Sequence, residues 1–204
     1  MRRTKEEAAI TRQLLLKKAL TVFSKKGYAA TTLEDIAREA EVTRGAIYWH
    51  FGSKAELYNT LVREYSDRGN AIVQQAASEG GTLLEILRRV FVRQLQAIED
   101  DRDLRALMEL YLFKTGLVPE LEEGRQQQIE SGAGLIEMIA GIMGQGIELG
   151  LLRSDVDPKD MARAYLAFQN GLTQLWLITS NQFSLKTSAN SFADIIMAGI
   201  QAQE

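Results

Sequence analysis

The residues best suited to chemistry lie in the segment 43–51, where small, basic and aromatic side chains share one helical pattern. Arg44 stands in its first turn, and a forked guanidinium there can donate to the O6 and N7 atoms of guanine. Gly45 and Ala46 beside it are small enough to let the helix sit deep in a major groove. The chemistry that this pattern predicts is the reading of double-stranded DNA.

The neighbouring polar groups are suited to phosphates. Tyr48 and His50 can donate to phosphate oxygens, which position a protein on DNA without reading its sequence. Ser53 begins another capped helix, and the positive end of that helix, together with Lys54, suits one more phosphate.

Two short helices must position these groups. The first has an apolar face with the spacing i, i+3, i+4 and i+7, formed by Leu33, Ile36, Ala37 and Ala40. Thr32 is a candidate N-cap, and Asp35 three residues later approximates a capping box. After a break, Thr43 can cap the second helix, whose Ile47 and Phe51 face inward. The arrangement predicts a helix-turn-helix.

Other chemistries find little support. A short helix pair with an aromatic cluster is also compatible with plain core, and Trp49 with a packing residue. His50 is the only histidine and there is no cysteine, which excludes a multi-histidine metal site, thiolate catalysis, disulfides and cysteine-bound zinc. No motif pairs a nucleophile with a base. We therefore expect no enzyme, no cofactor and no metal.

Composition indicates the fold class. The 204 residues include two prolines and no β-like alternation of any length, so we expect an all-α fold. No run of about 20 apolar residues predicts a membrane span, and the N-terminal residues lack the apolar stretch of a signal peptide. The expected location is the cytoplasm.

Charge is distributed unevenly. Residues 1–65 carry 12 Lys and Arg against 8 Asp and Glu, a net charge of +4, and the remainder carries −7, which gives the −3 of the whole chain. Because phosphate contacts are local, a basic N-terminal third suits nucleic acid better than the overall acidity indicates.

These residues resemble the DNA-binding region of TetR/AcrR-type transcriptional regulators. The resemblance rests on Phe23–Tyr28 (FSKKGY), Thr32–Ala37 (TLEDIA) and Val42–Phe51 (VTRGAIYWHF), and it covers roughly residues 4–60 before weakening. It implies base contacts from Thr43, Arg44, Gly45 and Ala46, and contacts to the DNA backbone from Thr32, Tyr48, Trp49, His50 and Lys54. Gly52 stands where relatives often have a polar residue, so one phosphate contact is expected to be missing.

The resemblance and the helical patterns together imply about nine helices in two domains. These are a three-helix helix-turn-helix domain at residues 1–52 and a larger ligand-binding and dimerisation domain at residues 53–204. In the first helix, which would begin at a capping box at Thr4, the inner stripe is predicted to contain Ile10, Leu14, Ala19, Val22 and Phe23. Later helix starts are indicated at Ser53, Thr82, Asp157–Pro158, and Thr187 or Ser188.

A ligand pocket between helices of the larger domain is what the family implies. The candidate effector-binding residues are Tyr65, Ser66, Met108, Tyr111, Gln128, Met138, Phe168 and Gln169. Methionine and aromatic side chains adapt to varied apolar ligands, although each of these residues taken alone is more often plain core.

The helix predicted over residues 119–151 is rich in glycine. It contains Gly132, Gly134, Gly141, Gly144, Gly146 and Gly150, and each interior glycine destabilises a helix by about 0.8–1 kcal/mol relative to alanine. Close helix packing is the favoured explanation, and a deformable pocket wall is the alternative.

The last two helices predict an interface, because a helix that is apolar on two sides must be covered twice. The predicted interface residues are Tyr165, Gly171, Leu175, Ile178, Phe192, Ile195, Ile196 and Gly199. Two such helices from each of two chains would form a four-helix bundle on a two-fold axis, as the family also implies. The alternative is that these residues form a core within one chain, and helical periodicity cannot distinguish a core from an interface.

The predicted function is therefore a ligand-responsive transcriptional repressor. As a homodimer it would bind a palindromic operator and be released by a small apolar effector, for example in the control of efflux genes. A DNA-binding activator or architectural dimer without an effector is the alternative. The predicted partners are operator DNA, the effector and a second copy of the chain, with no membrane.

Overall fold

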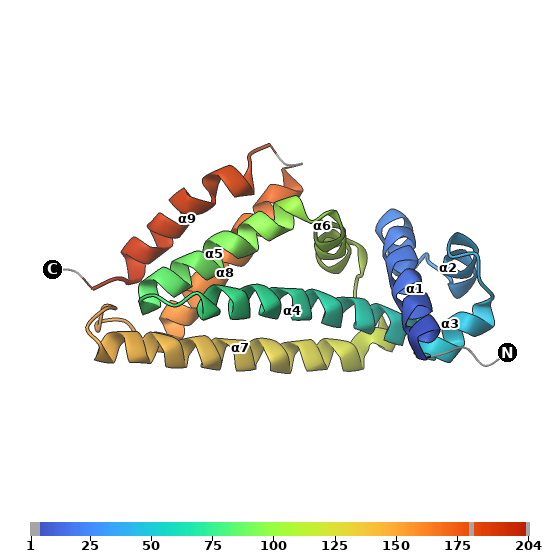
Figure 1. The fold of residues 1–204 in the computed structure, drawn as a ribbon, viewed down its shortest axis with the longest axis horizontal. Helices are drawn as coiled ribbons and strands as arrows, with labels where there is room; N and C mark the ends of the chain where they lie inside the picture. Colours follow the sequence, from blue (N-terminus) through green and yellow to red (C-terminus); the bar gives the residue numbers. More distant parts are fainter. Residues whose placement is uncertain (1–4, 180–181, 203–204) are drawn as a thin grey trace. The chain divides into compact units, whose positions relative to one another are not determined.

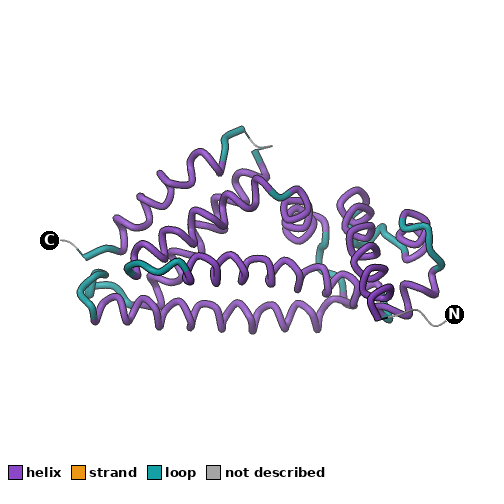
Figure 2. Tube along the Cα trace, in the orientation of Figure 1, coloured by secondary structure: helices purple, strands orange, loops and turns teal. Residues whose placement is uncertain are grey.

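The computed structural model describes residues 5–179 and 182–202, apart from the side chain of Tyr65. Within these residues the regular structure is helical, as Figures 1 and 2 show, and the prediction of an all-α chain with about nine helices is confirmed. The α-helices are α1 (Lys5–Lys26), α2 (Leu33–Glu39), α3 (Arg44–Phe51), α4 (Lys54–Ser78), α5 (Leu83–Asp100), α6 (Arg102–Glu109), α7 (Glu122–Glu148), α8 (Pro158–Ile178) and α9 (Leu185–Ile200). A π-helical turn, Leu110–Lys114, follows α6, and a 3-10 turn, Pro119–Leu121, precedes α7.

The chain divides into two compact units. Unit 1 comprises Met1–Asp67 and Arg102–Gly124, and unit 2 comprises Arg68–Asp101 and Arg125–Glu204. The boundaries fall inside α4, between α5 and α6, and in the first turn of α7. The three N-terminal helices therefore share their unit with the start of α4 and with residues 102–124.

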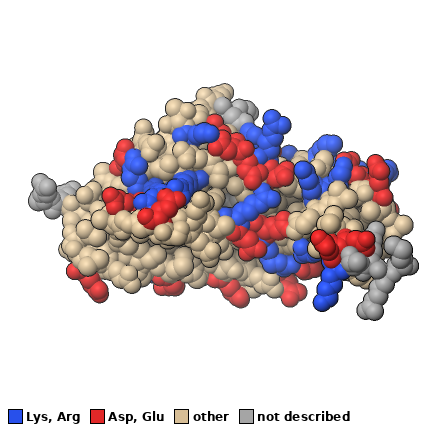
Figure 3. All heavy atoms as spheres, viewed as in Figure 1, with Lys and Arg blue, Asp and Glu red and all other residues tan. Residues whose placement is uncertain are grey.

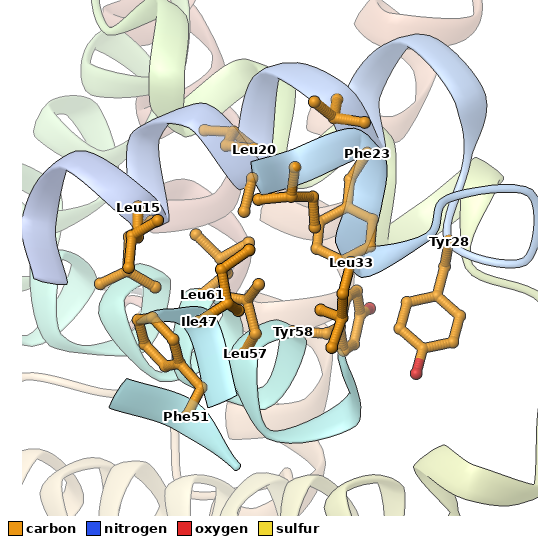
Figure 4. Packing of buried hydrophobic residues seen from close by; sticks show 14 of the residues in the cluster. Leu15, Leu20, Phe23, Tyr28, Leu33, Ile47, Phe51, Leu57, Tyr58 and Leu61 are labelled. Carbon is orange, nitrogen blue, oxygen red and sulfur yellow. The ribbon is translucent and has the colours of Figure 1, made fainter. Parts of the chain in front are cut away.

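Unit 1 has one continuous hydrophobic core, drawn in Figure 4. Phe23 stacks on Tyr28 with ring centroids 5.6 Å apart, and Tyr58 of α4 meets both rings edge-on. Ile36 of α2 and Ile47 of α3 are fully buried in the same cluster. Helices of seven and eight residues are not stable alone in water, so α2 and α3 depend on the core that α1 and α4 provide.

The predicted inner stripe of α1 is wrong in its first half. Ile10 is 65% exposed and Leu14 is also exposed, whereas burial begins at Leu15 and continues to Phe23. At 1.5 Å per residue α1 is about three times as long as α2 or α3, so these short helices cover only part of it. The capping box predicted at Thr4 lies outside the described residues.

The helix starts that depend on local sequence agree with the predictions. Thr32 and Asp35 form a capping box at α2, as do Thr82 and Glu85 at α5, and Asp157 caps α8. The last helix begins earlier than predicted, at Leu185 with Ser184 as its N-cap.

The early start of α9 has a tertiary cause in unit 2. The Ser184 hydroxyl accepts from the backbone N–H of Thr187 at 3.0 Å and donates to the Glu99 carboxylate, which also accepts from the backbone N–H of Lys186 at 2.8 Å. Glu99 belongs to α5, so the sequence of residues 180–190 alone does not reveal this contact.

Unit 2 is built on the contacts of α5 with α8 and α9. Phe91 stacks on Phe168 with centroids 5.9 Å apart and meets Tyr165 edge-on. The chain end is tied to the loop after α7: the Arg153 N–H donates to the Ile200 carbonyl at 3.0 Å, and the Ala202 N–H donates to the Leu151 carbonyl at 3.1 Å.

Of the five glycines of α7 in unit 2, only Gly146 is explained by close packing. A Cβ added to Gly146 would lie 2.5 Å from Leu152 and 2.7 Å from Leu83, whereas one added to Gly132, Gly134, Gly141 or Gly144 would meet nothing within 4 Å. Gly150 has a positive φ of 68° at the turn that ends the helix. Close packing within the described chain is therefore wrong as the reason for the four open glycines.

Candidate nucleic-acid interface

Helix α3 is held so that one side is buried and the other meets solvent. Thr43 caps it by accepting from the Ala46 N–H at 3.2 Å, as predicted. Ile47 and Phe51 are buried, also as predicted, which turns Tyr48 outward and leaves Trp49 70% exposed. The predicted base-contacting residues Thr43, Arg44 and Gly45 are exposed and Ala46 is half-buried. The helix therefore presents small, basic and aromatic groups on one accessible side.

Gly52 has a conformational role at the end of α3. Its φ is +74°, and its N–H donates to the Tyr48 carbonyl at 2.8 Å. Positive φ favours glycine, so Gly52, which stands where relatives often have a polar residue, serves to terminate the helix.

Arg44 is engaged inside its own unit. Its guanidinium lies 2.5 Å from the Glu34 carboxylate of α2, donates to the Tyr48 hydroxyl at 2.7 Å, and lies 5.0 Å from the centroid of the Tyr48 ring. The Tyr48 hydrogen bond and then the charge of Glu34 raise the pKa of Arg44. The predicted base reader is thus positioned on the surface by two neighbours that sequence analysis did not connect to it.

The start of α2 is a tight polar cluster. The Thr32 hydroxyl accepts from the Asp35 N–H at 3.1 Å, and the Asp35 carboxylate accepts from Lys26 at 2.8 Å. Lys26, and then the backbone and hydroxyl of Thr32, hold the pKa of Asp35 well below its usual range. The Thr32 side chain is therefore committed to the cap, and its contact with DNA stays a prediction.

Lys54 is largely enclosed, with a side chain 19% exposed. Its ammonium donates to the carbonyls of Tyr28 at 3.3 Å and Thr31 at 3.2 Å, lies 4.3 Å from the centroid of the Tyr28 ring, and is 3.5 Å from the Glu120 carboxylate. Two N–H groups of the ammonium thus donate to backbone carbonyls, and its charge is paired with Glu120 within unit 1. The structure gives Lys54 a role in holding the start of α4 to the α1–α2 turn, and its contact with a phosphate stays a prediction.

The segment 110–121 is bound to the same turn, which sequence analysis missed. The Tyr28 N–H donates to the Lys114 carbonyl at 2.9 Å, and the Lys114 ammonium donates to the Ser24 carbonyl at 2.8 Å. The Tyr28 hydroxyl donates to Glu120 at 2.8 Å; burial, and then this bond, raise the pKa of Tyr28 above its usual range. The one sign of this contact in the local sequence is Gly27, which has a φ of +77°. It packs against the Lys114 carbonyl, whose oxygen lies 3.1 Å from where a Cβ would be.

The predicted effector-binding residues fall in both units. Ser66, Met108 and Tyr111 belong to unit 1, where Met108 is buried and Tyr111 is exposed; Tyr65 lies in α4, and its side chain is outside the described part. The other four belong to unit 2, where they are Gln128, Met138, Phe168 and Gln169. Gln169 is buried and donates to Gln94 at 2.6 Å beside the stacked Phe91 and Phe168 rings. These two contacts join a stacked aromatic pair and a polar pair between α5 and α8.

A groove of about 480 Å³ lies elsewhere in unit 2. It is lined by Thr82, Leu84, Glu85, Arg88, Asp194, Met197, Ala198 and Gln201. None of the predicted effector residues lines it.

The predicted interface residues of α8 and α9 divide into two groups. Leu175, Ile178 and Ile195 are exposed, the last to 61%, and a Cβ added to Gly171 or Gly199 would meet nothing within 4 Å. Phe192 and Ile196 are half-buried. Tyr165 is 2% exposed and its hydroxyl donates to the Leu87 carbonyl at 2.9 Å, so its assignment to a dimer surface is wrong. It belongs to the core between α5 and α8.

The described residues hold no cluster of three or more His, Cys, Asp or Glu side chains placed for a metal ion. None of the described helices combines the length and apolar character needed to cross a bilayer. Lys, Arg, Asp and Glu are intermixed over the surface in Figure 3 rather than gathered in one basic field.

Family comparisons cover most of the chain. Residues 15–61 match the model for bacterial regulatory proteins of the tetR family, and residues 82–201 match that for the C-terminal region of MAATS-type transcriptional repressors. The chain is 32% identical to the HTH-type transcriptional regulator AcrR of Shigella flexneri over 197 residues, covering 96% of this chain and 92% of that one. It is 31% identical to the HTH-type transcriptional regulator TtgR of Pseudomonas putida, covering 95% and 93%.

Solved structures are similar over the same length. NalD, described as the secondary repressor of the MexAB-OprM multidrug efflux pump in Pseudomonas aeruginosa, superposes with a TM-score of 0.86 at 26% identity, covering 98% of this chain and 100% of that one. A complex of SmeT with triclosan gives a TM-score of 0.81 at 26% identity, covering 95% and 93%.

Proposed function

Because the chain belongs to the TetR family of bacterial regulatory proteins, we propose that it represses transcription from a palindromic operator, which it binds as a homodimer and leaves when a small effector binds. Because the family consists of transcriptional regulators, we propose no catalytic activity for this chain. The proposed site of action is the cytoplasm, where the operator is accessible.

The exposed side of α3 is the observation that carries the DNA-binding part of the proposal. Two copies related by a two-fold axis would place two α3 helices in successive major grooves, about 34–36 Å apart. Arg44 would read guanine, with Thr43, Gly45 and Ala46 against the neighbouring bases. Tyr48, Trp49, His50 and Thr32 would contact the DNA backbone, and Lys54 would support them by fixing the start of α4.

We propose that dimerisation uses the exposed apolar side of α8 and α9. Leu175, Ile178 and Ile195 are large apolar side chains that face solvent in one chain, and exposed apolar surface of this kind marks protein contacts. The open Gly171 and Gly199 would allow helices of the second copy to approach closely.

A small apolar effector suits the aromatic side chains near the polar pair Gln94–Gln169, which could orient a ligand by one hydrogen bond. The similar solved structures include the secondary repressor of a multidrug efflux pump and a complex of SmeT with triclosan, and the first of these supports efflux genes as the regulated class. The effector would bind preferentially to a state with weaker DNA affinity, and a coupling of about 1–3 kcal/mol suffices for partial derepression. We propose that the contacts of segment 110–121 with Tyr28 help carry this coupling to α2 and α3.

The experiment begins with selection of genomic fragments bound by the wild-type dimer, followed by a screen for compounds that release them. Arg44→Ala is expected to weaken binding to the selected site by about 1–3 kcal/mol and to relax base preference at one position of each half-site. Arg63→Ala removes a guanidinium from α4 of the same unit and is the control. Equal base selectivity in wild type and Arg44→Ala would reject Arg44 as the reader. Failure of every compound to release DNA would favour a regulator without an effector.

A further inference from the structure

The ion pair between Arg44 and Glu34 concerns the very group that is proposed to read guanine. The Arg44 guanidinium is 2.5 Å from the Glu34 carboxylate, and it also donates to the Tyr48 hydroxyl at 2.7 Å. Bidentate recognition of guanine needs two N–H groups aimed at O6 and N7. In the free protein two nitrogens of the fork already have acceptors, so DNA must compete for them.

Glu34 differs from the acidic side chains around it. Asp35 is neutralised by Lys26 and Arg38, and Glu39 is paired with Lys18. Among the described residues the only cation paired with Glu34 is Arg44. Once Arg44 turns to a base, Glu34 remains as an uncompensated negative charge on α2, next to an approaching phosphate backbone.

We infer that Glu34 is an autoinhibitory residue, which holds Arg44 back from DNA and lowers affinity most where Arg44 leaves it for guanine. The inference rests on the proposed DNA-binding function. At the correct site, guanine O6 and N7 replace the carboxylate as acceptors for Arg44. On other sequences the arginine either keeps Glu34 and contributes nothing to the complex, or leaves it and finds no equivalent partner.

The physical basis is a competition between Glu34 and DNA for the guanidinium of Arg44. Non-specific binding comes almost entirely from the attraction between cationic side chains and phosphates, and a carboxylate that occupies Arg44 and repels phosphate lowers that attraction. Binding to guanine requires that the Arg44–Glu34 pair be broken, so the palindrome bears the full cost of this competition, whereas another duplex can leave the pair intact. Because the Arg44–Glu34 pair is about half exposed on both sides, its effect is modest, about two- to five-fold in affinity.

The test uses Glu34→Gln in the full-length dimer, with Glu41→Gln as the matched control. Glu41 lies in the turn between α2 and α3, is exposed, and takes part in none of the ion pairs of the described residues. Its substitution by Gln changes the net charge by the same amount as Glu34→Gln does, without breaking an ion pair. Binding is measured at one physiological salt concentration to a palindromic duplex selected by the wild type and to a scrambled duplex of the same length. Both substitutions are also made in Arg44→Ala, and circular dichroism verifies folding.

We expect Glu34→Gln to tighten binding to the palindrome about two- to five-fold, to tighten binding to the scrambled duplex less, and to lose this difference in the Arg44→Ala background. An equal gain on both duplexes, matching that of Glu41→Gln, would mean that only net charge matters and would overturn the inference. Selective weakening of the palindrome would make Glu34 a base reader and would also overturn it. If the wild type itself did not distinguish the two duplexes, the proposed function would fail first, which separates the two failures.

Discussion

The helix pair α2–α3 and the helix pair α8–α9 expose different chemistry although both are amphipathic. In α2–α3 the large aliphatic side chains are inside, and the exposed residues are Arg44, Tyr48, Trp49 and charged groups. In α8–α9 one side packs around Trp176 and Tyr165, while Leu175, Ile178 and Ile195 meet solvent on another. The large aliphatic side chains of α2–α3 are covered by their own chain, whereas several of those of α8–α9 are not.

This difference indicates the class of partner that each surface suits. A face of hydrogen-bond donors and aromatic edges remains hydrated until it meets another polar surface, such as a DNA groove. An apolar stripe lowers its free energy only by being buried, which a second protein surface can do. We therefore propose that the two pairs divide recognition between nucleic acid and a second copy of the chain, and the following substitutions test that division.

The support of α2–α3 by α1 should show the largest effect on stability. Phe23→Ala removes a fully buried ring between Tyr28 and Tyr58 and is expected to lower the free energy of unfolding of unit 1 by about 3–5 kcal/mol. Hydrogen exchange in α2 and α3 should become faster, whereas dimerisation is retained. Ile10→Ala in the same helix, at an exposed position, should change stability by less than about 0.5 kcal/mol. Loss of the dimer in Phe23→Ala would show that the two pairs are not independent.

The apolar side of α8–α9 is tested by adding charge. The double substitution Leu175→Glu and Ile195→Glu should convert the dimer to monomer in light scattering and weaken operator binding roughly 100-fold or more, because the two half-sites are no longer linked. Asn190→Glu places the same charge on an exposed polar position of α9 and should leave the dimer intact. A dimer that survives the double substitution would place the interface elsewhere.

The enclosed ammonium of Lys54 should matter for stability as well as for DNA. Lys54→Met keeps most of the side-chain length but leaves the Tyr28 and Thr31 carbonyls without their donor, and we expect a loss of about 1–3 kcal/mol in urea denaturation. Lys18→Met removes an exposed pair with Glu39 and should change stability by less than about 1 kcal/mol. Unchanged stability with equally weaker binding to all duplexes would instead identify Lys54 as a direct phosphate contact.

The open glycines of α7 should give the smallest effect, and with the opposite sign. Gly141→Ala and Gly144→Ala each place a methyl group in open space and are expected to stabilise the helix by about 0.8–1 kcal/mol. Gly146→Ala is the matched substitution in the same helix and should destabilise, because its methyl group would collide with Leu152 and Leu83. A stabilised double variant that still responds to effector would argue against a deformable pocket wall, whereas a lost response would support one.

Much of the fold follows from patterns within about four residues. The Thr32–Asp35 and Thr82–Glu85 boxes and the Asp157–Pro158 start were readable because a cap and its partner are neighbours in sequence. The burial of Ile47 and Phe51 was readable from their spacing. Which of two apolar sides another helix covers is not local information. Ile10 and Tyr165 were therefore assigned incorrectly, one as core and the other as interface.

The site shows the same boundary between local and long-range information. The exposed residues of α3 were predicted, but the partners of Arg44 and Lys54 were not. Glu34 reaches Arg44 across a turn, and Glu120 reaches Lys54 from a segment more than 60 residues away in sequence. A charged side chain in a binding motif is therefore not always available to a ligand. Residues distant in sequence can already pair with its charge and hydrogen-bond donors.

The pairing of the chain end with the loop after α7 has a practical consequence for engineering. Because Ile200 and Ala202 share backbone hydrogen bonds with Arg153 and Leu151, a reporter protein fused directly after Ala202 would pull on the loop that separates α7 from α8. A flexible spacer before the fused partner would keep that strain out of unit 2, and a truncation before Ile200 would remove both of these backbone hydrogen bonds.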